Sequence, residues 1–587
     1  MKHLLIYCLC LSSFVALTTA AEKPNIIVIY TDDHGFADLG IRGVEKDVKT
    51  PHLDALARSG VIAKNGYSTA PQCVPSRGGL MTGKFQGRFN LDNNGSALDG
   101  FNKETTIATR LQNAGYTTAQ FGKWHLGPQS EITKHGFKHV YSQHGQQKFP
   151  ANITVEGKDR PMGDMPPELY HVDGSAKAAA SIIERCKDKP FFLYLAFRAP
   201  HTPLDAPQAY KDRFPGEMPE RRRAALGMLA AVDDGVGLVT STLKKNGLTE
   251  KTLIFFIGDN GAPLKIHKTD SPLQGDAGGW DGSLNTPLNG EKGMLSEGGM
   301  HVPFLIAWPG TISGGQTYEH PVSALDVAAT AVAVADASVK HGDLDGVNLI
   351  PYLKGEITTA PHEALMWRWM AQSAIREGNW KLLRGGEREY LYDLSTDLEE
   401  KHNLASQHPD IATRLRAKLT AWCADLNPPG LALGPMAPVW NDYFDFYLEG
   451  KPVPKPEAKP DAAKSETQGW MARGGKLVKK DGVLVLTPDS GGKGTFITHS
   501  QLKIPGPAIA KLTLKTAASG PAAVAWRVDG DKDFLPANRA SFEVKTSDDW
   551  QTHEVPIPAK GRVIHVRVHL PAGPAEFRMI ELQPASR

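Results

Sequence analysis

Short apolar runs rich in β-branched and aromatic residues recur along the chain, and amphipathic stretches separate them. The runs predict buried strands at Asn25–Tyr30, Thr117–Phe121, Phe191–Phe197 and Leu253–Ile257. The stretches between them predict helices, for example at Pro51–Ser59, Glu104–Ala114, Gly174–Cys186 and Arg221–Lys245. Strands that alternate with helices indicate an α/β fold with a mostly parallel central sheet covered on both faces.

The pattern changes near Pro361. Ala374–Leu383 and Glu389–Leu394 predict a small antiparallel sheet, and Pro409–Leu426 a helix, which together suggest a small C-terminal α+β subdomain. Residues 449–466 are rich in proline and lysine, which predicts an extended linker. The rest alternates in short runs typical of an all-β sandwich. These runs are Gly482–Leu486, Gly494–Ile497, Lys511–Lys515, Val524–Val528, Ser541–Val544 and Val563–Val568.

The first residues have the pattern of a secretory signal peptide. Lys2 and His3 precede an apolar run from Leu4 to Leu17, and small residues follow. The run is shorter than the ~20 residues that span a bilayer, and no later segment is long enough, so we expect no membrane span. Such a peptide would direct the protein to the periplasm or the exterior, with cleavage near Ala20 or Ala21. The expected organisation is a signal peptide (1–20), a main α/β domain (21–360), the subdomain (361–448), the linker (449–466) and a β-sandwich module (467–587).

Composition adds little chemistry of its own. The 66 Lys and Arg nearly balance the 64 Asp and Glu, so we expect no nucleic-acid partner, and anion recognition must be local. After loss of the signal peptide the chain keeps Cys73, Cys186 and Cys423, too few for a disulfide scaffold. Cys186 and Cys423 could pair or remain buried thiols.

Polar side chains follow each of the four predicted strands. In chain order they are Asp32 and Asp33, Lys123 and His125, His201, and Asp259 and Asn260. Ligands of α/β proteins bind at the carboxyl ends of parallel strands, so these side chains are candidates for one site. The acids and the amide offer only oxygen, which suits Ca²⁺ or Mg²⁺. Each pair alone could equally cap a helix, but capping does not explain the whole set.

Cys73 begins a predicted helix whose first turn contains Pro75, and Arg77 follows in the same segment. The free N–H groups and dipole of a helix N-terminus attract anions, and Arg77 adds a fixed cation. A lone cysteine is more often a buried structural residue. A thiolate is also a soft ligand among hard oxygen donors. An aldehyde at this position, hydrated to a gem-diol, would instead supply oxygen for both binding and attack.

The segment from Cys73 to Gly83 resembles the sulfatase signature C-x-P-S-R-x-x-L-x-T-G, whose cysteine is oxidised to formylglycine (3-oxoalanine), and matches it at every defined position. Gly122–Gly127 resembles the second signature of the same family. The resemblance extends from Asn25 to about Trp422. It implies an alkaline-phosphatase-like fold, a Ca²⁺ ion, sulfate ester hydrolysis and a formylglycine-generating maturation enzyme as partner. By motif position, the metal ligands would be an oxygen of the modified Cys73 and the side chains of Asp32, Asp33, Asp259 and Asn260.

The resemblance also implies catalytic roles. Arg77 and Lys123 would steady the formylglycine hydrate and the sulfate. One hydroxyl of the hydrate would attack sulfur while His201, with Lys292 beside it, protonates the leaving oxygen. His125 would take the proton of the second hydroxyl, so that sulfate leaves.

Substrate contacts are less defined. Many relatives have Leu where this chain has His34, and Arg where it has His301. Candidates for reading the sugar are Arg88, Asn90, His267, His301, Trp367 and Arg368, and for each a structural role is at least as plausible. Trp470, Trp526 and Trp550 of the sandwich could stack on sugars or fill its core.

Three hypotheses follow. The first is a sulfatase that acts on a sulfated polysaccharide or oligosaccharide, with galactose or N-acetylgalactosamine sulfate as the suggested sugar. The second is a phosphomonoester or phosphodiester hydrolase on the same fold. The third is a glycan-binding relative without activity.

Overall fold

The computed structural model describes residues 23–585, apart from 145–146, 152, 156–157, 161–169, 268–279, 341, 432–435, 453–466, 468, 490–494, 501 and 532. The predicted signal peptide and nearly all of the predicted linker lie outside these residues. The chain divides into two compact units, residues 1–454 and 455–587. Each unit is described by itself.

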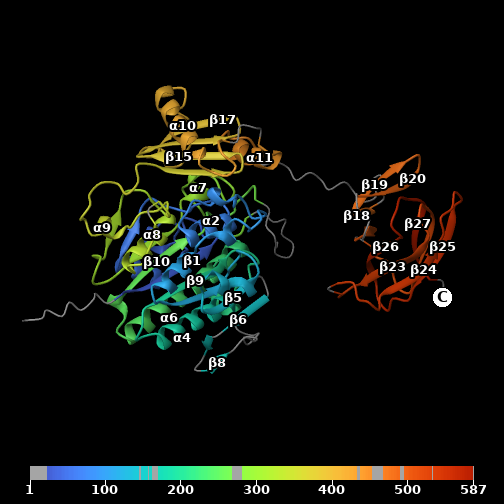
Figure 1. The fold of residues 1–587 in the computed structure, drawn as a ribbon, viewed down its shortest axis with the longest axis horizontal. Coiled ribbons are helices and arrows are strands. Elements are labelled where there is room, and N and C mark those ends of the chain that lie inside the picture. Colours follow the sequence, from blue (N-terminus) through green and yellow to red (C-terminus); the bar gives the residue numbers. More distant parts are fainter. Residues whose placement is uncertain are drawn as a thin grey trace, which may run out of the picture. The chain divides into compact units, whose positions relative to one another are not determined.

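A nine-stranded sheet forms the centre of the first unit (Figure 1). Its order is β12 (Gln316–Tyr318), β2 (Val61–Ala63), β11 (Phe304–Ala307), β10 (Thr252–Gly258), β1 (Asn25–Asp32), β9 (Phe191–Pro200), β4 (Thr117–Gly122), β5 (His139–His144) and β6 (Gln147–Ala151). The strands from β10 to β5 run parallel to one another, and β11 and β6 pair antiparallel at the two ends of this run. The predicted α/β fold and its four central strands are confirmed.

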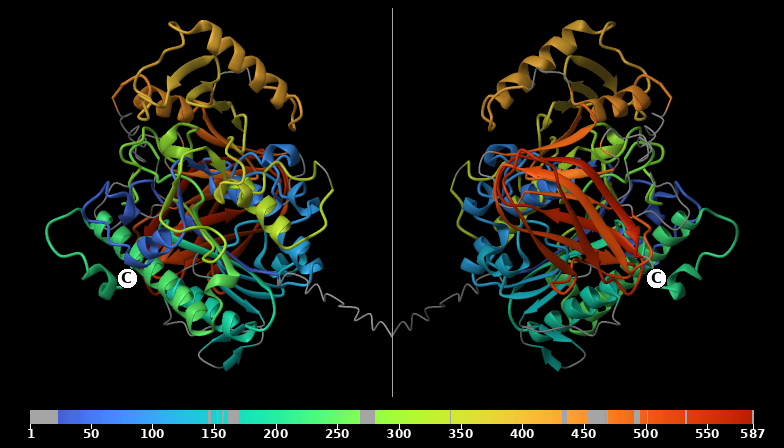
Figure 2. Two further views of the ribbon diagram at one scale, coloured as in Figure 1. Left: turned by 90° about the vertical axis from the view of Figure 1, so that its left-hand side faces the viewer. Right: turned by 90° about the vertical axis from the view of Figure 1, so that its right-hand side faces the viewer.

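Alternate residues of β1 enter two different cores. Ile26, Val28 and Tyr30 pack on the side of α2 (Cys73–Thr82), α3 (Ile107–Asn113) and α8 (Leu325–Val334). Ile27 and Ile29 pack on the side of α1 (Pro51–Arg58), α4 (His171–Arg185) and α6 (Glu220–Lys245). Figures 1 and 2 show α4 and α6 running side by side along the sheet. Among the described helices, α6 alone has the length and apolarity to cross a membrane, but 78% of its apolar window is buried in the protein.

A second, antiparallel sheet completes the first unit. It contains β14 (Leu365–Trp369), β15 (Gln372–Glu377), β16 (Trp380–Gly385) and β17 (Arg388–Asp393), packed with α10 (Pro409–Cys423) and α11 (Pro438–Tyr447). Sequence patterning missed β14 and α11. A buried ion network links this sheet to α7 (Glu297–Met300), since Lys381 Nζ lies 2.8 Å from Glu297 Oε1 and 2.9 Å from Glu400 Oε1.

The second unit is a sandwich of two five-stranded sheets, as predicted. One has the order β18 (Met471–Arg473), β21 (Phe496–His499), β26 (Val563–His569), β23 (Gly520–Val528) and β24 (Arg539–Val544). The other has the order β19 (Gly475–Lys480), β20 (Val483–Pro488), β27 (Ala575–Pro584), β22 (Ala508–Thr516) and β25 (Gln551–Ile557). Trp470 and Trp526 are buried in the core between them.

Candidate functional site

The carboxyl ends of β10, β1, β9 and β4 lie at one edge of the main sheet. Because these strands are parallel neighbours, residues far apart in the sequence meet there. Asp32 ends β1, and Asp33 follows in the left-handed region with φ of 57°. The Asp33 backbone N–H donates to Asp259 Oδ1 at 3.0 Å, which joins the ends of β1 and β10.

Helix α2 adds Cys73 and Arg77 to this edge. Cys73 is the first residue of the helix, and its Sγ lies 3.2 Å from Asp32 Oδ1 and 3.9 Å from Asp33 Oδ1. The fully buried Arg77 donates to Asp259 Oδ2 at 2.9 Å and to the Tyr194 hydroxyl at 3.2 Å. The helix therefore delivers the nucleophile candidate and a fixed cation together.

Two lysines complete the buried charge cluster. Lys123 pairs with Asp32 Oδ2, and Lys292 Nζ lies 2.7 Å from Asp33 Oδ2. The Asn260 amide donates to Asp33 Oδ1 at 2.6 Å. We call the whole set the strand-end cluster, namely Asp32, Asp33, Cys73, Arg77, Lys123, Asp259, Asn260 and Lys292.

The acids of the cluster differ in proton affinity. Burial opposes the ionisation of Asp32, but the charges of Lys123, His201 and Arg77 hold its pKa well below the usual range. Burial and the negative charge of Asp32 raise the pKa of Asp259 to about 8. Burial, with Asp259 and Asp32 nearby, also raises the pKa of the Cys73 thiol. Each of the three acids thus has a cationic partner, but burial and the charge of Asp32 still raise the pKa of Asp259.

The cluster fits a hard divalent cation. Asn260 Oδ1 is buried without a hydrogen-bond partner, although such an atom normally has one. One ligand atom each of Asp32, Asp33, Cys73 and His201 lies within 4.8 Å of the others. Carboxylate and amide oxygens match Ca²⁺ or Mg²⁺. The thiol is the one soft donor among the acids.

A cavity of about 390 Å³ opens onto the cluster. It is lined by Gln72, Asn94, Lys123, His125, Arg198, His201, Thr202, Pro203, His267 and Lys292. His201 Nδ1 donates to the Thr202 carbonyl at 2.6 Å, so Nε2, 3.5 Å from Asp33 Oδ2, faces the acids. Burial lowers the pKa of His201. Gln72, Asn94 and Arg198 were missed by sequence reasoning; only Arg198, near the end of β9, could have been found from its position.

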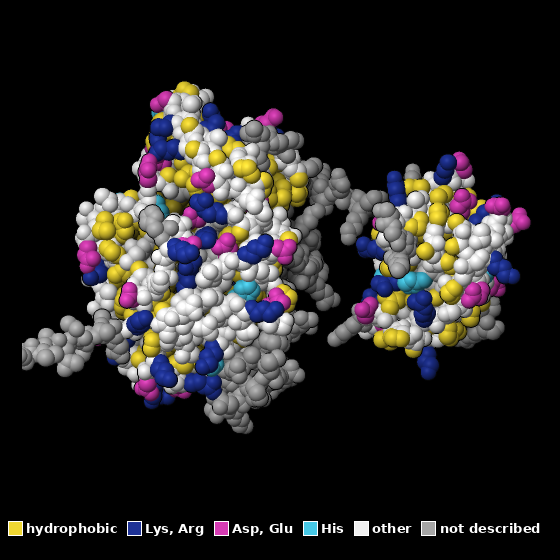
Figure 3. All heavy atoms as spheres, in the orientation of Figure 1, with side chains coloured by type: hydrophobic (Ala, Val, Ile, Leu, Met, Phe, Trp, Pro, Cys, Tyr) yellow, Lys and Arg dark blue, Asp and Glu magenta, His cyan; other side chains and the backbone are white. Residues whose placement is uncertain are grey.

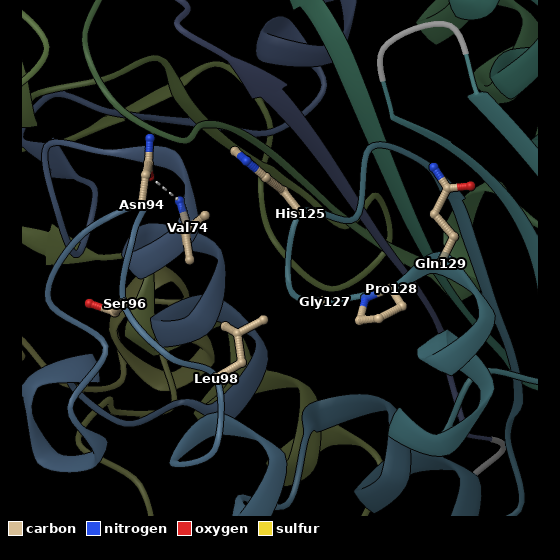
Figure 4. A pocket seen from close by; sticks show the side chains of 8 residues that line it. All are labelled: Val74, Asn94, Ser96, Leu98, His125, Gly127, Pro128 and Gln129. Carbon is tan, nitrogen blue, oxygen red and sulfur yellow. Dashed lines mark hydrogen bonds between the residues drawn. The ribbon is translucent and has the colours of Figure 1, made fainter. Parts of the chain in front are cut away.

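A second cavity of about 310 Å³ adjoins the first, and Asn94 and His125 line both. Figure 4 shows its remaining lining, which is Val74, Ser96, Leu98, Gly127, Pro128 and Gln129. Asn94 Oδ1 accepts from the Val74 backbone N–H at 3.0 Å, the dashed line in Figure 4. Apart from His125 the lining has no titratable side chain, in contrast to the lysines of the first cavity.

Of the six residues expected to read a sugar, only His267 lines either cavity. Arg88 pairs with Asp345 at 2.8 Å. Asn90 ends a short 3₁₀ helix in the left-handed region, with φ of 62°. These two lie outside both linings, and their role as substrate contacts stays a prediction.

The other three are buried and bonded within the protein. His301 contacts Glu297 Oε2 at 3.0 Å and the Lys64 carbonyl at 2.7 Å. Trp367 donates to the Ser68 carbonyl at 3.1 Å. Arg368 donates to backbone carbonyls, including that of Gly430 at 2.9 Å. Trp367 and Arg368 thereby tie β14 to neighbouring loops, and His301 ties α7 to the backbone at Lys64. Cys186 and Cys423 are both buried free thiols.

Comparisons with known proteins agree with this architecture. The family profile described as Sulfatase matches residues 24–337, and the profile described as N-sulphoglucosamine sulphohydrolase, C-terminal, matches residues 290–425. N-acetylgalactosamine-6-sulfatase of Mus musculus is 30% identical over 395 residues, which cover 62% of this chain and 72% of that protein. Uncharacterized sulfatase YdeN of Escherichia coli (strain K12) is 29% identical over 505 residues, covering 69% and 86%. The crystal structure of Ps i-CgsB in complex with k-i-k-neocarrahexaose matches with a TM-score of 0.60 and 31% identity, covering 70% of this chain and 95% of that one.

Proposed function

Because this chain belongs to the sulfatase family of the alkaline-phosphatase-like superfamily, and is a sulfuric ester hydrolase, we propose that it removes sulfate from a sulfated polysaccharide or oligosaccharide after Cys73 is oxidised to formylglycine. The observation that carries the chemistry is the place of Cys73. It begins α2 with its Sγ 3.2 Å from Asp32 Oδ1, among carboxylates, basic side chains and the imidazole of His201. A thiol has no evident use there.

The names of relatives favour a glycan substrate. One relative is an N-acetylgalactosamine-6-sulfatase, and one solved neighbour holds k-i-k-neocarrahexaose. Both names support a sulfated galactose or N-acetylgalactosamine as the reacting sugar of this chain.

The proposed metal is Ca²⁺, held by Asp32, Asp33, Asp259 and Asn260 together with an oxygen at position 73. When bound, it would add positive charge beside the acids and stabilise charge on sulfate oxygens. Formylglycine at position 73 would provide a hydrated aldehyde as the nucleophile.

The chain's own side chains perform the remaining tasks. Lys123, which pairs with Asp32, and Lys292, which pairs with Asp33, both line the cavity and bind sulfate oxygens. Arg77 keeps Asp259 in place. His201, whose Nδ1 is fixed by the Thr202 carbonyl, donates a proton from Nε2 to the leaving sugar oxygen. His125 lines the same cavity and accepts the proton released when sulfate departs.

The two cavities hold different parts of the substrate, one charged and one uncharged. The lysine-lined cavity takes the sulfated sugar. The adjoining cavity offers amides and a hydroxyl beside apolar side chains, which suits a neighbouring sugar ring without a charged group. An oligosaccharide that occupies both cavities then contacts Asn94 and His125, which line both.

Turnover on paired substrates tests the proposal. Purified protein, co-expressed with a formylglycine-generating enzyme, should hydrolyse an aryl sulfate much faster than the matching aryl phosphate. Mass spectrometry of the Cys73 peptide should show the mass of the aldehyde or its hydrate. Faster phosphate hydrolysis would favour a phosphohydrolase instead, and active protein with only unmodified thiol would refute the formylglycine mechanism.

Export is the last part of the proposal. The signal-peptide pattern of the N-terminus supports cleavage near Ala20 or Ala21. N-terminal sequencing of protein recovered from periplasm or medium should begin near residue 21 or 22.

A further inference from the structure

Basic and aromatic side chains gather on the outward face of one sheet of the second unit. Val566, Val568 and Trp526 point into the core, so the residues between them on β26 and β23 point outward. Antiparallel pairing arranges the outward residues of β21, β26, β23 and β24 in rows across the sheet. The rows are Phe496–His569–Ala523–Ser541, Thr498–Arg567–Ala525–Arg539 and His565–Arg527. We call Arg527, Arg539, His565, Arg567 and His569 the basic face.

The basic face forms no ion pair among the described residues, although Asp531 lies beside it: its carbonyl accepts from the Arg527 guanidinium, and its Oδ2 accepts from the Val528 N–H at 2.9 Å. Within the described part of the second unit, the ion pairs are Lys511–Glu554 and Arg562–Asp529, and neither includes a member of the face. The Nε atoms of Arg527 and Arg567 are buried without hydrogen-bond partners. Glu543 lies one step beyond Ser541 on β24, at the margin of the face.

Besides burial, the positive charge of the arginines lowers the pKa of the two histidines of the face, His565 and His569. Burial and the charges of Arg567 and Arg527 lower the pKa of His565. Burial and the charges of Arg539 and Arg567 lower the pKa of His569. An anion that sits between these groups would relieve their mutual repulsion.

Aromatic contacts hold the basic groups in place. The Arg567 guanidinium lies 3.9 Å from the ring centre of Phe534 and 5.0 Å from that of Phe496. His565 Nε2 lies 2.7 Å from the Thr498 hydroxyl. The alanines of β23 have small side chains, which leave space between Arg567 and Arg539. A planar guanidinium held in this way loses little entropy when it binds an oxyanion.

The opposite sheet also carries basic groups. Its outward residues include Lys511 and Glu554, which pair at 3.2 Å, and Lys515 and Arg578, which lie over the ring of Trp550, the residue before β25. Residues 467–587 as a whole hold 17 Lys or Arg against 11 Asp or Glu. Basic residues exceed acids on the strands of both sheets, four to one on the first and six to three on the second. The first sheet is distinguished by rows that combine arginines with histidines, and Figure 3 shows histidine beside basic side chains over the part of this unit where Figure 1 labels β23 and β26.

We propose that the basic face binds a sulfated polysaccharide chain. Sulfate groups pair with Arg527, Arg539 and Arg567 as charge-assisted hydrogen bonds, and the rings of Phe534 and Phe496 contact the apolar faces of the sugars. The site binds polymer and performs no chemistry. The identity of this polyanion rests on the proposed function, whereas the existence of the anion site does not.

Binding by the full-length chain tests this proposal. Each variant carries Cys73→Ala, which prevents turnover. One variant adds both Arg539→Glu and Arg567→Gln. Another adds Arg539→Glu alone, because Arg539 is exposed and its replacement leaves the core intact. The matched control is Lys476→Glu, an exposed residue of β19 in the other sheet, which changes the net charge as Arg539→Glu does. Dissociation constants are measured for dextran sulfate, unsulfated dextran and duplex DNA.

The double replacement should raise the dissociation constant for dextran sulfate at least tenfold, and the single one severalfold, while the control changes it less than twofold. Unsulfated dextran should not bind. Equal losses in variant and control, equal binding of unsulfated dextran, or tighter binding of DNA would each overturn the proposal. Aryl sulfate turnover by the same variants with Cys73 restored separates the two failures, since lost binding with intact turnover leaves the sulfatase function standing.

Discussion

The strand-end cluster and the basic face both gather charged side chains, but in opposite surroundings. The cluster is buried at the carboxyl ends of parallel strands, and its lysines and arginine each pair with an acid. The basic face lies on an antiparallel sheet, and its arginines have no acid partner among the described residues. A buried charge must be paired with an opposite charge to be tolerated. An exposed charge is solvated by water and can stay unpaired until a ligand binds. Replacements should therefore have large effects in the first unit and small effects on stability in the second.

The largest expected effect is on turnover. Cys73→Ala removes the precursor of the nucleophile and should lower aryl sulfate turnover roughly 10³-fold or more. Circular dichroism should show an unchanged fold, because alanine fits the start of α2. Turnover within tenfold of the parent would show that another group attacks sulfur.

Lys381→Met tests the cost of breaking a buried network. It leaves the carboxylates of Glu297 and Glu400 together without their cation, so the free energy of unfolding should fall by about 3–5 kcal/mol. Lys401→Met is the control, since Lys401 and its partner Glu399 are exposed and their pairing should contribute little to stability. Similar losses in urea titrations of both variants would contradict the distinction.

Removing the divalent cation tests the metal part of the cluster. Dialysis against a chelator should lower the melting temperature, and the loss corresponds to about 2.7 kcal/mol where free Ca²⁺ was a hundred times its dissociation constant. Ca²⁺ should restore the original value. Asp259→Asn should reduce this response, and Asp343→Asn, which alters a peripheral ion pair, should not. A melting temperature that is insensitive to chelator would refute the metal site.

Filling the uncharged cavity tests its role in substrate binding. Leu98→Trp should lower kcat/KM for a sulfated oligosaccharide about tenfold, mainly through KM, and leave that for an aryl sulfate unchanged. Leu535→Trp, at an exposed position of the second unit, controls for the added ring. Equal loss on both substrates would place the cavity within the reacting site itself.

The smallest effect is expected for stability at the basic face. Arg539→Glu should change the free energy of unfolding by less than about 0.5 kcal/mol, because the side chain is exposed and unpaired. Its effect should be visible only in polyanion binding. A loss above 2 kcal/mol would show that the arginine stabilises the sandwich.

Several features could be predicted from the sequence because they are local. The four central strands are apolar runs, and the residues that follow them are polar whatever their neighbours. The alternation beyond residue 466 predicted the sandwich. The Cys73 signature predicted the family, which the comparisons confirm. The roles of the individual site residues stay predictions.

Other features depend on which segments become neighbours. The sheet order β10-β1-β9-β4 brings Asp33 and Asp259, 226 positions apart, to a 3.0 Å hydrogen bond. Asn94 enters the cavities from an irregular loop that has no pattern, whereas Trp367 and Arg368, promising as sequence, turn inward because their strand belongs to a buried sheet. The basic face exists only through antiparallel register, which places side chains from four strands in common rows. Local sequence thus predicted the central strands, several helices and the chemistry at the strand ends, and the long-range pairing of strands decided which groups lie together.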